Sequence, residues 1–256
     1  MGYNLGKEDE ARIISLAKKY RVEKVILFGS RARGDNRPDS DVDLALSGGN
    51  YLEFAFDFDD ETNGNVKCDV TYLDHEIELD LRNAINEEGI VLYEDKIDYE
   101  RRYQLFSEAL NNFERFVELA KQYPDNDSFV LLEVSKVFGA CFKQSWKLLK
   151  LLLESYGESF DKNVAPSVVL EVACRCGIIE DSLSWRELLD SYNDCGDVKT
   201  EYLKMFHDLK CRVDTMNSDE QRHSVIDSCG RVGRQIYSAS DSCRARNYRI
   251  EYQVTL

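Results

Sequence analysis

A segment near the N-terminus, residues 26–48, places the strongest constraint on how this chain folds. It reads ILFGSRARGDNRPDSDVDLALSG, in which a short apolar run leads directly into Gly29 and Ser30. Ten residues further on, Asp41 and Asp43 stand one residue apart. A continuous apolar run of this length indicates a buried strand, and a glycine at its end permits a tight turn into a helix. The segment therefore predicts a strand, a turn and a second strand that carries two carboxylates.

The second predicted strand, residues 41–46, alternates between polar and apolar side chains. Side chains two residues apart on a strand project from the same face, so the carboxylates of Asp41 and Asp43 can share a divalent cation. Magnesium suits such a site, because it accepts a few carboxylates and completes its shell with water and phosphate oxygens. A third carboxylate, Asp69, lies in another alternating segment, residues 66–73. It would complete a site that holds two metal ions, or one metal ion and a general base.

The residues around the glycine favour phosphate as the ligand. Gly29 lets the backbone approach a phosphate, and Ser30 offers a hydroxyl close to the start of a helix, where anions are stabilised. Arg31 and Arg33 add charge-assisted hydrogen-bond donors. Together these parts suit the transfer of a nucleotidyl group from a nucleoside triphosphate to an acceptor hydroxyl.

Gly29-Ser30, ten intervening residues and Asp41-Val42-Asp43 resemble the signature of the polymerase-beta-type nucleotidyltransferases. The longer string FGSRARGDNRPDSDVDLAL is similar to their minimal nucleotidyltransferase branch, and the resemblance covers about residues 10 to 94. It implies an α/β (α+β) fold with a mixed sheet, a two-metal Mg²⁺ site, and ATP as the favoured nucleoside triphosphate. In the resemblance, Asp41, Asp43 and Asp69 are both metal ligands and catalytic carboxylates, with Asp69 as the general base. The triphosphate contacts that it implies are Gly29 and Ser30.

The chain changes character at about residue 97. Before this point, helices are predicted at 7–20 and 51–61, and strands at 24–28, 41–46 and 66–73. After it, helical patterns follow at 98–123, 127–156, 167–176, 182–192 and 198–215, which predicts an all-α helical bundle. We therefore expect two domains, residues 1–96 and 97–256, the second including a tail, 217–256, of unassigned structure.

The predicted bundle resembles the HEPN-like nucleotidyltransferase substrate-binding proteins. The resemblance rests on FKQSWKLLKLLLESYG, APSVVLEVACRCGII and SWRELLDSYN, within about residues 98 to 210. Many such bundles carry an Arg-Asn pair followed four residues later by His, a set that cleaves RNA in related toxins. Here Tyr192-Asn193 and Asp197 stand in those places, so ribonuclease activity is not expected. Trp146 and Trp185 are expected in the helical core.

The composition restricts the partners and the compartment. The net charge of −15 opposes long nucleic acids, whose non-specific binding depends on lysine and arginine. No apolar stretch approaches the roughly 18 residues of a membrane span, and the charged N-terminus does not resemble a secretory signal. We therefore expect a cytoplasmic protein with no membrane partner, in which the eight cysteines stay reduced.

Three functions fit these observations. The first is an enzyme that transfers AMP to a small acceptor, such as a cationic antibiotic of the aminoglycoside type, bound between the two domains. The second is a relative of HEPN and minimal nucleotidyltransferase toxin–antitoxin pairs, which would modify a protein tyrosine or an RNA end. The third is a nucleotide-binding pseudoenzyme, which the three retained aspartates disfavour. The acceptor and the choice of nucleotide cannot be read from the sequence, and a homodimer is expected.

Overall fold

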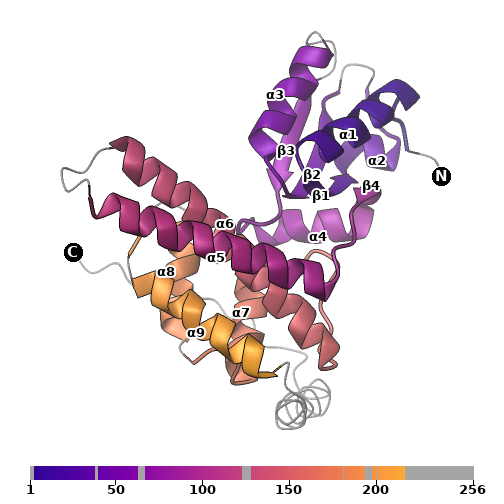
Figure 1. Ribbon diagram of the computed structural model, residues 1–256. Helices are drawn as coiled ribbons and strands as arrows, with labels where there is room; N and C mark the ends of the chain where they lie inside the picture. Colours follow the sequence, from indigo (N-terminus) through magenta and orange to yellow (C-terminus); the bar gives the residue numbers. More distant parts are fainter. Residues whose placement is uncertain are drawn as a thin grey trace, which may run out of the picture.

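The computed structural model describes residues 3–37, 40–62, 67–122, 128–180, 182–193, 198–199 and 201–216. Figure 1 shows an α/β part built from the first third of the chain, joined to a part in which all the described elements are helices. The predicted tail, 217–256, and Asp197 lie outside the described residues.

The α/β part contains one four-stranded sheet with the order β3-β2-β1-β4. β1 pairs antiparallel with both β2 and β4, whereas β2 and β3 are parallel. The sheet is therefore mixed, which confirms the predicted fold class. The elements of this part are α1 (Lys7–Lys19), β1 (Val22–Leu27), α2 (Gly29–Arg33), β2 (Val42–Gly48), α3 (Tyr51–Glu61), β3 (Cys68–Tyr72), α4 (Leu79–Glu88) and β4 (Ile90–Glu94).

Alternation along the strands divides the α/β core between the two faces of the sheet. One face packs against α1 and α3, where Leu16, Phe54 and Phe58 are buried with the apolar side chains of β1 and β2. The other face packs against α4, where Ile85 contacts a small cluster that includes Ala45. The odd-numbered side chains of β2 therefore point to the α4 side.

The helical part buries one continuous core. Its helices are α5 (Tyr99–Ala120), α6 (Ser128–Ser155), α7 (Pro166–Arg175), α8 (Ser182–Asn193) and α9 (Glu201–Met216). Phe106, Phe113 and Phe206 meet edge to face near its centre. Trp146 and Trp185 are buried in this core, as predicted. Among the described residues, no helix is both long enough and apolar enough to cross a membrane.

Two elements of the α/β part were not predicted, namely α4 and β4. α4 has only a narrow apolar stripe, and Leu79 at its start is 70% exposed, so its helical periodicity is weak. β4 lies at the edge of the sheet and its side chains alternate poorly between buried and exposed. The connection from β4 to α5 spans 95–98, where the sequence analysis placed the boundary between the domains; the division itself stays a prediction.

The two parts meet at one end of the sheet. Contacts from α5 and α6 reach Glu23 at the start of β1, and Ser47 at the end of β2. α6 also contacts Tyr72 at the end of β3. We call this region the seam.

Candidate active site

The three predicted carboxylates lie on adjacent strands, at the end of the sheet away from the seam. Asp43 is the second residue of β2 and stands directly beside Asp69 of β3 in the parallel register. Asp41 comes just before β2, two residues from Asp43. Asp41 and Asp69 are exposed, while Asp43 is partly buried. The strand pairing thus brings the three side chains to one edge of the sheet.

Gly29 packs directly against Asp43. The backbone N–H of Phe28 donates to the carbonyl oxygen of Asp43 at 3.0 Å, which fixes the end of β1 against β2. A Cβ atom at Gly29 would lie 2.2 Å from Oδ2 of Asp43, and the φ angle of Gly29 is 69°. Both the space and the left-handed backbone exclude any larger residue. The glycine of the motif is therefore needed to seat this carboxylate.

The surroundings of Asp43 disfavour its negative charge. Burial raises the pKa of Asp43, and the nearby negative charges of Asp69 and Asp41 raise it further. Arg33 and Arg31 act in the opposite direction but do not outweigh these effects. A cation between the carboxylates would reverse this balance, since opposite charges favour the ionised form.

The donor set fits a magnesium ion. Three carboxylates offer hard oxygen ligands, and a site with few protein ligands leaves room for water and phosphate oxygens. Within the described ranges, no group of three or more His, Cys, Asp or Glu side chains is already close enough to hold a metal ion. Asp41, Asp43 and Asp69 would hold it, with Asp43 and Asp69 as the pair fixed by strand register.

Ser30 stands next to Gly29 in the first turn of α2. Its carbonyl oxygen accepts hydrogen bonds from the backbone of Gly34 and Asp35, which closes the turn after α2. Its hydroxyl has no partner among the residues that the structure describes, so it is free to bind a ligand. A contact between Ser30 and the triphosphate stays a prediction.

The two arginines of the motif differ in their surroundings. Arg31 is 9% exposed, and its guanidinium donates to the carbonyl oxygens of Ser40 at 2.6 Å, Asp41 at 3.2 Å and Asn4 at 3.4 Å. Arg33 is exposed and forms ion pairs with Asp35 and Glu88. The contact with phosphate that we predicted for both stays a prediction, and the structure gives Arg31 a second task, which is to hold the backbone of Asp41.

We expect Arg31→Lys to weaken Mg²⁺ binding in the absence of nucleotide by about tenfold, because one ammonium cannot replace a fork of charge-assisted hydrogen bonds worth about 1.5–3 kcal/mol each. Isothermal titration with Mg²⁺ measures this directly. Arg101→Lys, at an exposed position on α5, is the matched control. If only the KM for the nucleoside triphosphate rises, Arg31 binds phosphate and does not position Asp41.

The sequence analysis missed the charged residues of the seam. Lys147 of α6 is 6% exposed and contacts Glu23, Ser47 and Asp74. Arg102 of α5 also pairs with Glu23, at 2.9 Å. Lys143 and Lys147, four residues apart in the apolar stretch around Trp146, are the sequence feature that could have indicated the seam. The sequence analysis assigns this stretch to the core alone.

The contacts between the two parts bear on the predicted acceptor cleft between the bundle and the metal site, which stays a prediction. The hydrogen bonds and ion pairs described between the two parts lie at the seam, along α4 and in the segment just before α4. Tyr192, considered above near the degraded motif, is 9% exposed and packs against Phe142 and His75. The carboxylates therefore lie at the opposite end of the strands from the seam, although Asp43 points to the face of the sheet that α4 covers.

Comparison with known proteins finds a match to one family model and likenesses to solved structures. The family model described as "Polymerase beta, Nucleotidyltransferase" matches residues 11–98. Among solved structures, a toxin-antitoxin with AMP-PNP is 21% identical, over 34% of this chain and 74% of that chain, with a TM-score of 0.30. A mutant of the toxin-antitoxin MntA-HpeT is 18% identical over the same shares, with a TM-score of 0.29. Likenesses of this size say nothing about the substrate of this chain.

A comparison with curated proteins gives no match. The family match spans β1 to β4, and it includes all three carboxylates and the glycine that packs against Asp43. Residues 11–98 are therefore a nucleotidyltransferase domain of the polymerase beta type.

Proposed function

We propose that the protein transfers a nucleoside monophosphate, with AMP favoured, from a nucleoside triphosphate to an acceptor hydroxyl in a Mg²⁺-dependent reaction. The observation that carries this proposal is the register of β2 and β3, which sets Asp43 beside Asp69 while Gly29 packs against Asp43. When bound, Mg²⁺ would offset the charge of the triphosphate and of the leaving pyrophosphate.

The residues of the chain have separate roles in this reaction. Asp41 and Asp43 hold the metal, and Asp69 accepts the proton of the acceptor hydroxyl. The acceptor oxygen forms a bond to the α-phosphorus, and the bond from that phosphorus to the pyrophosphate oxygen breaks. Gly29 and Ser30 bind the triphosphate.

The position of the seam favours an acceptor that reaches the carboxylates from solvent. Asp41 and Asp69 are exposed, and the contacts that the bundle makes with the strands lie at the other end of these strands. A hydroxyl on a protruding group, such as a tyrosine of a partner protein, fits this arrangement better than a small molecule bound between the two parts. A HEPN-like bundle in residues 97–256 would then present the partner or form the homodimer, and it would not line the acceptor site.

We expect the purified protein to incorporate label from α-labelled ATP into a tyrosine-bearing protein acceptor, and to lose this activity when EDTA removes divalent metal. Added Mg²⁺ restores it, because the carboxylates need a cation to bind the triphosphate. Each labelled nucleoside triphosphate is tested against three sets of acceptors: cell protein, RNA, and an aminoglycoside panel. Absence of triphosphate binding in the presence of Mg²⁺ would contradict the proposal, whereas label on an aminoglycoside would replace the protein acceptor by a small one.

A further inference from the structure

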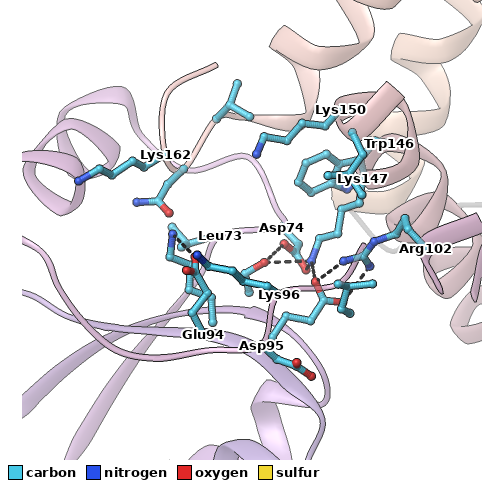
Figure 2. Close-up of a pocket in the computed structure, with 17 residues that line it drawn as sticks. Leu73, Asp74, Glu94, Asp95, Lys96, Arg102, Trp146, Lys147, Lys150 and Lys162 are labelled. Atoms are coloured by element: carbon cyan, nitrogen blue, oxygen red, sulfur yellow. Dashed lines mark hydrogen bonds and ion pairs between the residues drawn. The ribbon is translucent and has the colours of Figure 1, made fainter. Parts of the chain in front are cut away.

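A cavity of about 200 Å³ lies at the seam, and both parts of the chain line it. β1, β2 and the segment after β3 supply one side, while α5, α6 and the loop around Asn163 supply the other. Figure 2 shows it, with Lys150 reaching from α6 toward the strands. Since a liquid water occupies about 30 Å³, the space admits a small molecule or several waters.

The cavity is basic in a strongly acidic chain. Its lining has six basic and four acidic side chains, whereas the whole chain carries a net charge of −15. Lys147 pairs with two of the acids, Glu23 at 3.0 Å and Asp74 at 2.9 Å, and Arg102 also pairs with Glu23. The charges of these two acids, Glu23 and Asp74, are thus already balanced by Lys147 and Arg102.

Further cations remain after these pairs are counted. Lys24 pairs with Glu94 at 3.2 Å, so this acid is neutralised as well. Lys96 has no ion pair within the part of the chain that the structure describes. Lys150 pairs at 3.2 Å with Glu154, which does not line the cavity. Lys162 and one further acid, Asp95, also line the cavity, so cations still outnumber acids and the remaining lining attracts negative charge.

Hydrogen-bond donors next to the cavity also lack acceptors. Nε1 of Trp146 and Nε of Arg102 are both buried, and neither has a partner among the described residues. Both residues line the cavity. A buried N–H without an acceptor costs about 1–3 kcal/mol, and in native proteins such groups are usually explained by an ordered water or an ion. Both groups are donors, but both atoms are enclosed by protein and do not face the open space of the cavity.

We infer that this cavity binds a small oxyanion, a phosphate monoester or a carboxylate, whose charge is balanced by Lys96 and Lys150. The site is separate from the site of nucleotidyl transfer. Ser47 lies four positions after Asp43 on β2, which is about 13 Å along an extended strand. A ligand here bridges the two parts and stabilises the seam, so it acts as an effector and not as the acceptor.

The test is isothermal titration of the full chain with inorganic phosphate, glycerol 3-phosphate and succinate at constant ionic strength, with chloride as the reference anion. We expect at least one of the three to bind and to raise the melting temperature. The anion that binds best distinguishes a phosphate ligand from a carboxylate ligand. Lys96→Gln with Lys150→Gln should weaken binding about tenfold, since hydrogen bonds to charged groups contribute about 1.5–3 kcal/mol.

Control variants test whether the anion binds in this cavity, at the three aspartates, or only through the overall charge of the protein. Lys121→Gln, at an exposed position outside the cavity, should leave binding unchanged. Asp43→Asn should bind the anion as the wild type does. The inference is overturned if none of the anions binds, if the double lysine variant binds normally, or if Asp43→Asn abolishes binding.

Discussion

Asp43→Asn should lower the rate of nucleotidyl transfer by about a thousandfold or more, because it removes a metal ligand that supplies several kcal/mol of stabilisation in the transition state. The amide keeps the shape of the side chain and fits beside Gly29, so the fold is retained. Initial rates with labelled ATP, measured at saturating Mg²⁺, give the effect. Asp80→Asn, at an exposed position on α4, is the matched control and should be fully active.

The same variant should be at least as stable as the wild type at neutral pH. The pKa of Asp43 is raised by burial and by its neighbouring carboxylates, so its ionised form costs free energy in the folded state. This cost is absent at low pH and appears as the pH rises through the raised pKa, and asparagine removes it. Urea denaturation at pH 7 measures the change. A less stable Asp43→Asn protein would contradict the free-energy cost of the ionised carboxylate, and a fully active one would contradict the metal site.

Lys147→Met should lower the free energy of unfolding by about 3–5 kcal/mol, because it leaves buried carboxylates without their partner. Lys147 is 6% exposed, and its ammonium contacts Glu23, Asp74 and the hydroxyl of Ser47. Methionine keeps the unbranched side chain as far as the ε position and removes only the ammonium group, so the loss of stability mainly reports the charge. Urea denaturation followed by circular dichroism measures it.

Lys136→Met on the same helix is the control for this experiment. Lys136 pairs with Glu133 across one turn of α6, and its side chain is 60% exposed. Exposed pairs contribute about 0–1 kcal/mol, so this variant should resemble the wild type. Equal losses in Lys136→Met and Lys147→Met would show that the seam depends on helix packing and not on charge.

The seam also predicts how stability responds to acid. Burial alone would raise the pKa of Glu23, but Lys147 and Arg102 outweigh it and lower the pKa to about 2. Lys147 and Lys143 likewise outweigh burial at Asp74 and lower its pKa to about 2. A carboxylate with a lowered pKa stabilises the fold above its unfolded pKa of about 4, and this contribution is lost as the pH falls toward 2. Without Lys147, the pKa values of Glu23 and Asp74 are lowered less. In Lys147→Met, the loss of stability on acidification should therefore begin at a higher pH.

Local patterns in the sequence predicted most of the elements, because each has its own periodicity or its own turn residues. The helix predicted at 51–61 agrees with α3, and the strand predicted at 41–46 agrees with β2 except that Asp41 lies just outside it. α4 was missed because its buried face is narrow. β4 was missed because an edge strand needs little burial.

Local patterns could not predict which strands would be neighbours, and the site depends on that. The spacing of Asp41 and Asp43 predicted a shared face, but only the parallel pairing of β2 with β3 places Asp69 beside Asp43. The ion pairs of the seam were even harder to predict, since Glu23 and Lys147 are far apart in the sequence and neither belongs to a motif. A lysine in an apolar helix predicts a buried partner but does not identify it.

The buried charges of the seam also bear on how such a protein could be assembled from separate modules. Apolar surfaces accept many partners of suitable shape, whereas Glu23 and Asp74 require cations at fixed positions. A helical module taken from another protein would need the equivalents of Arg102 and Lys147 before it could dock on this sheet. The two parts of this chain are therefore matched to each other, and a chimaera that ignores this match should separate into independently moving halves.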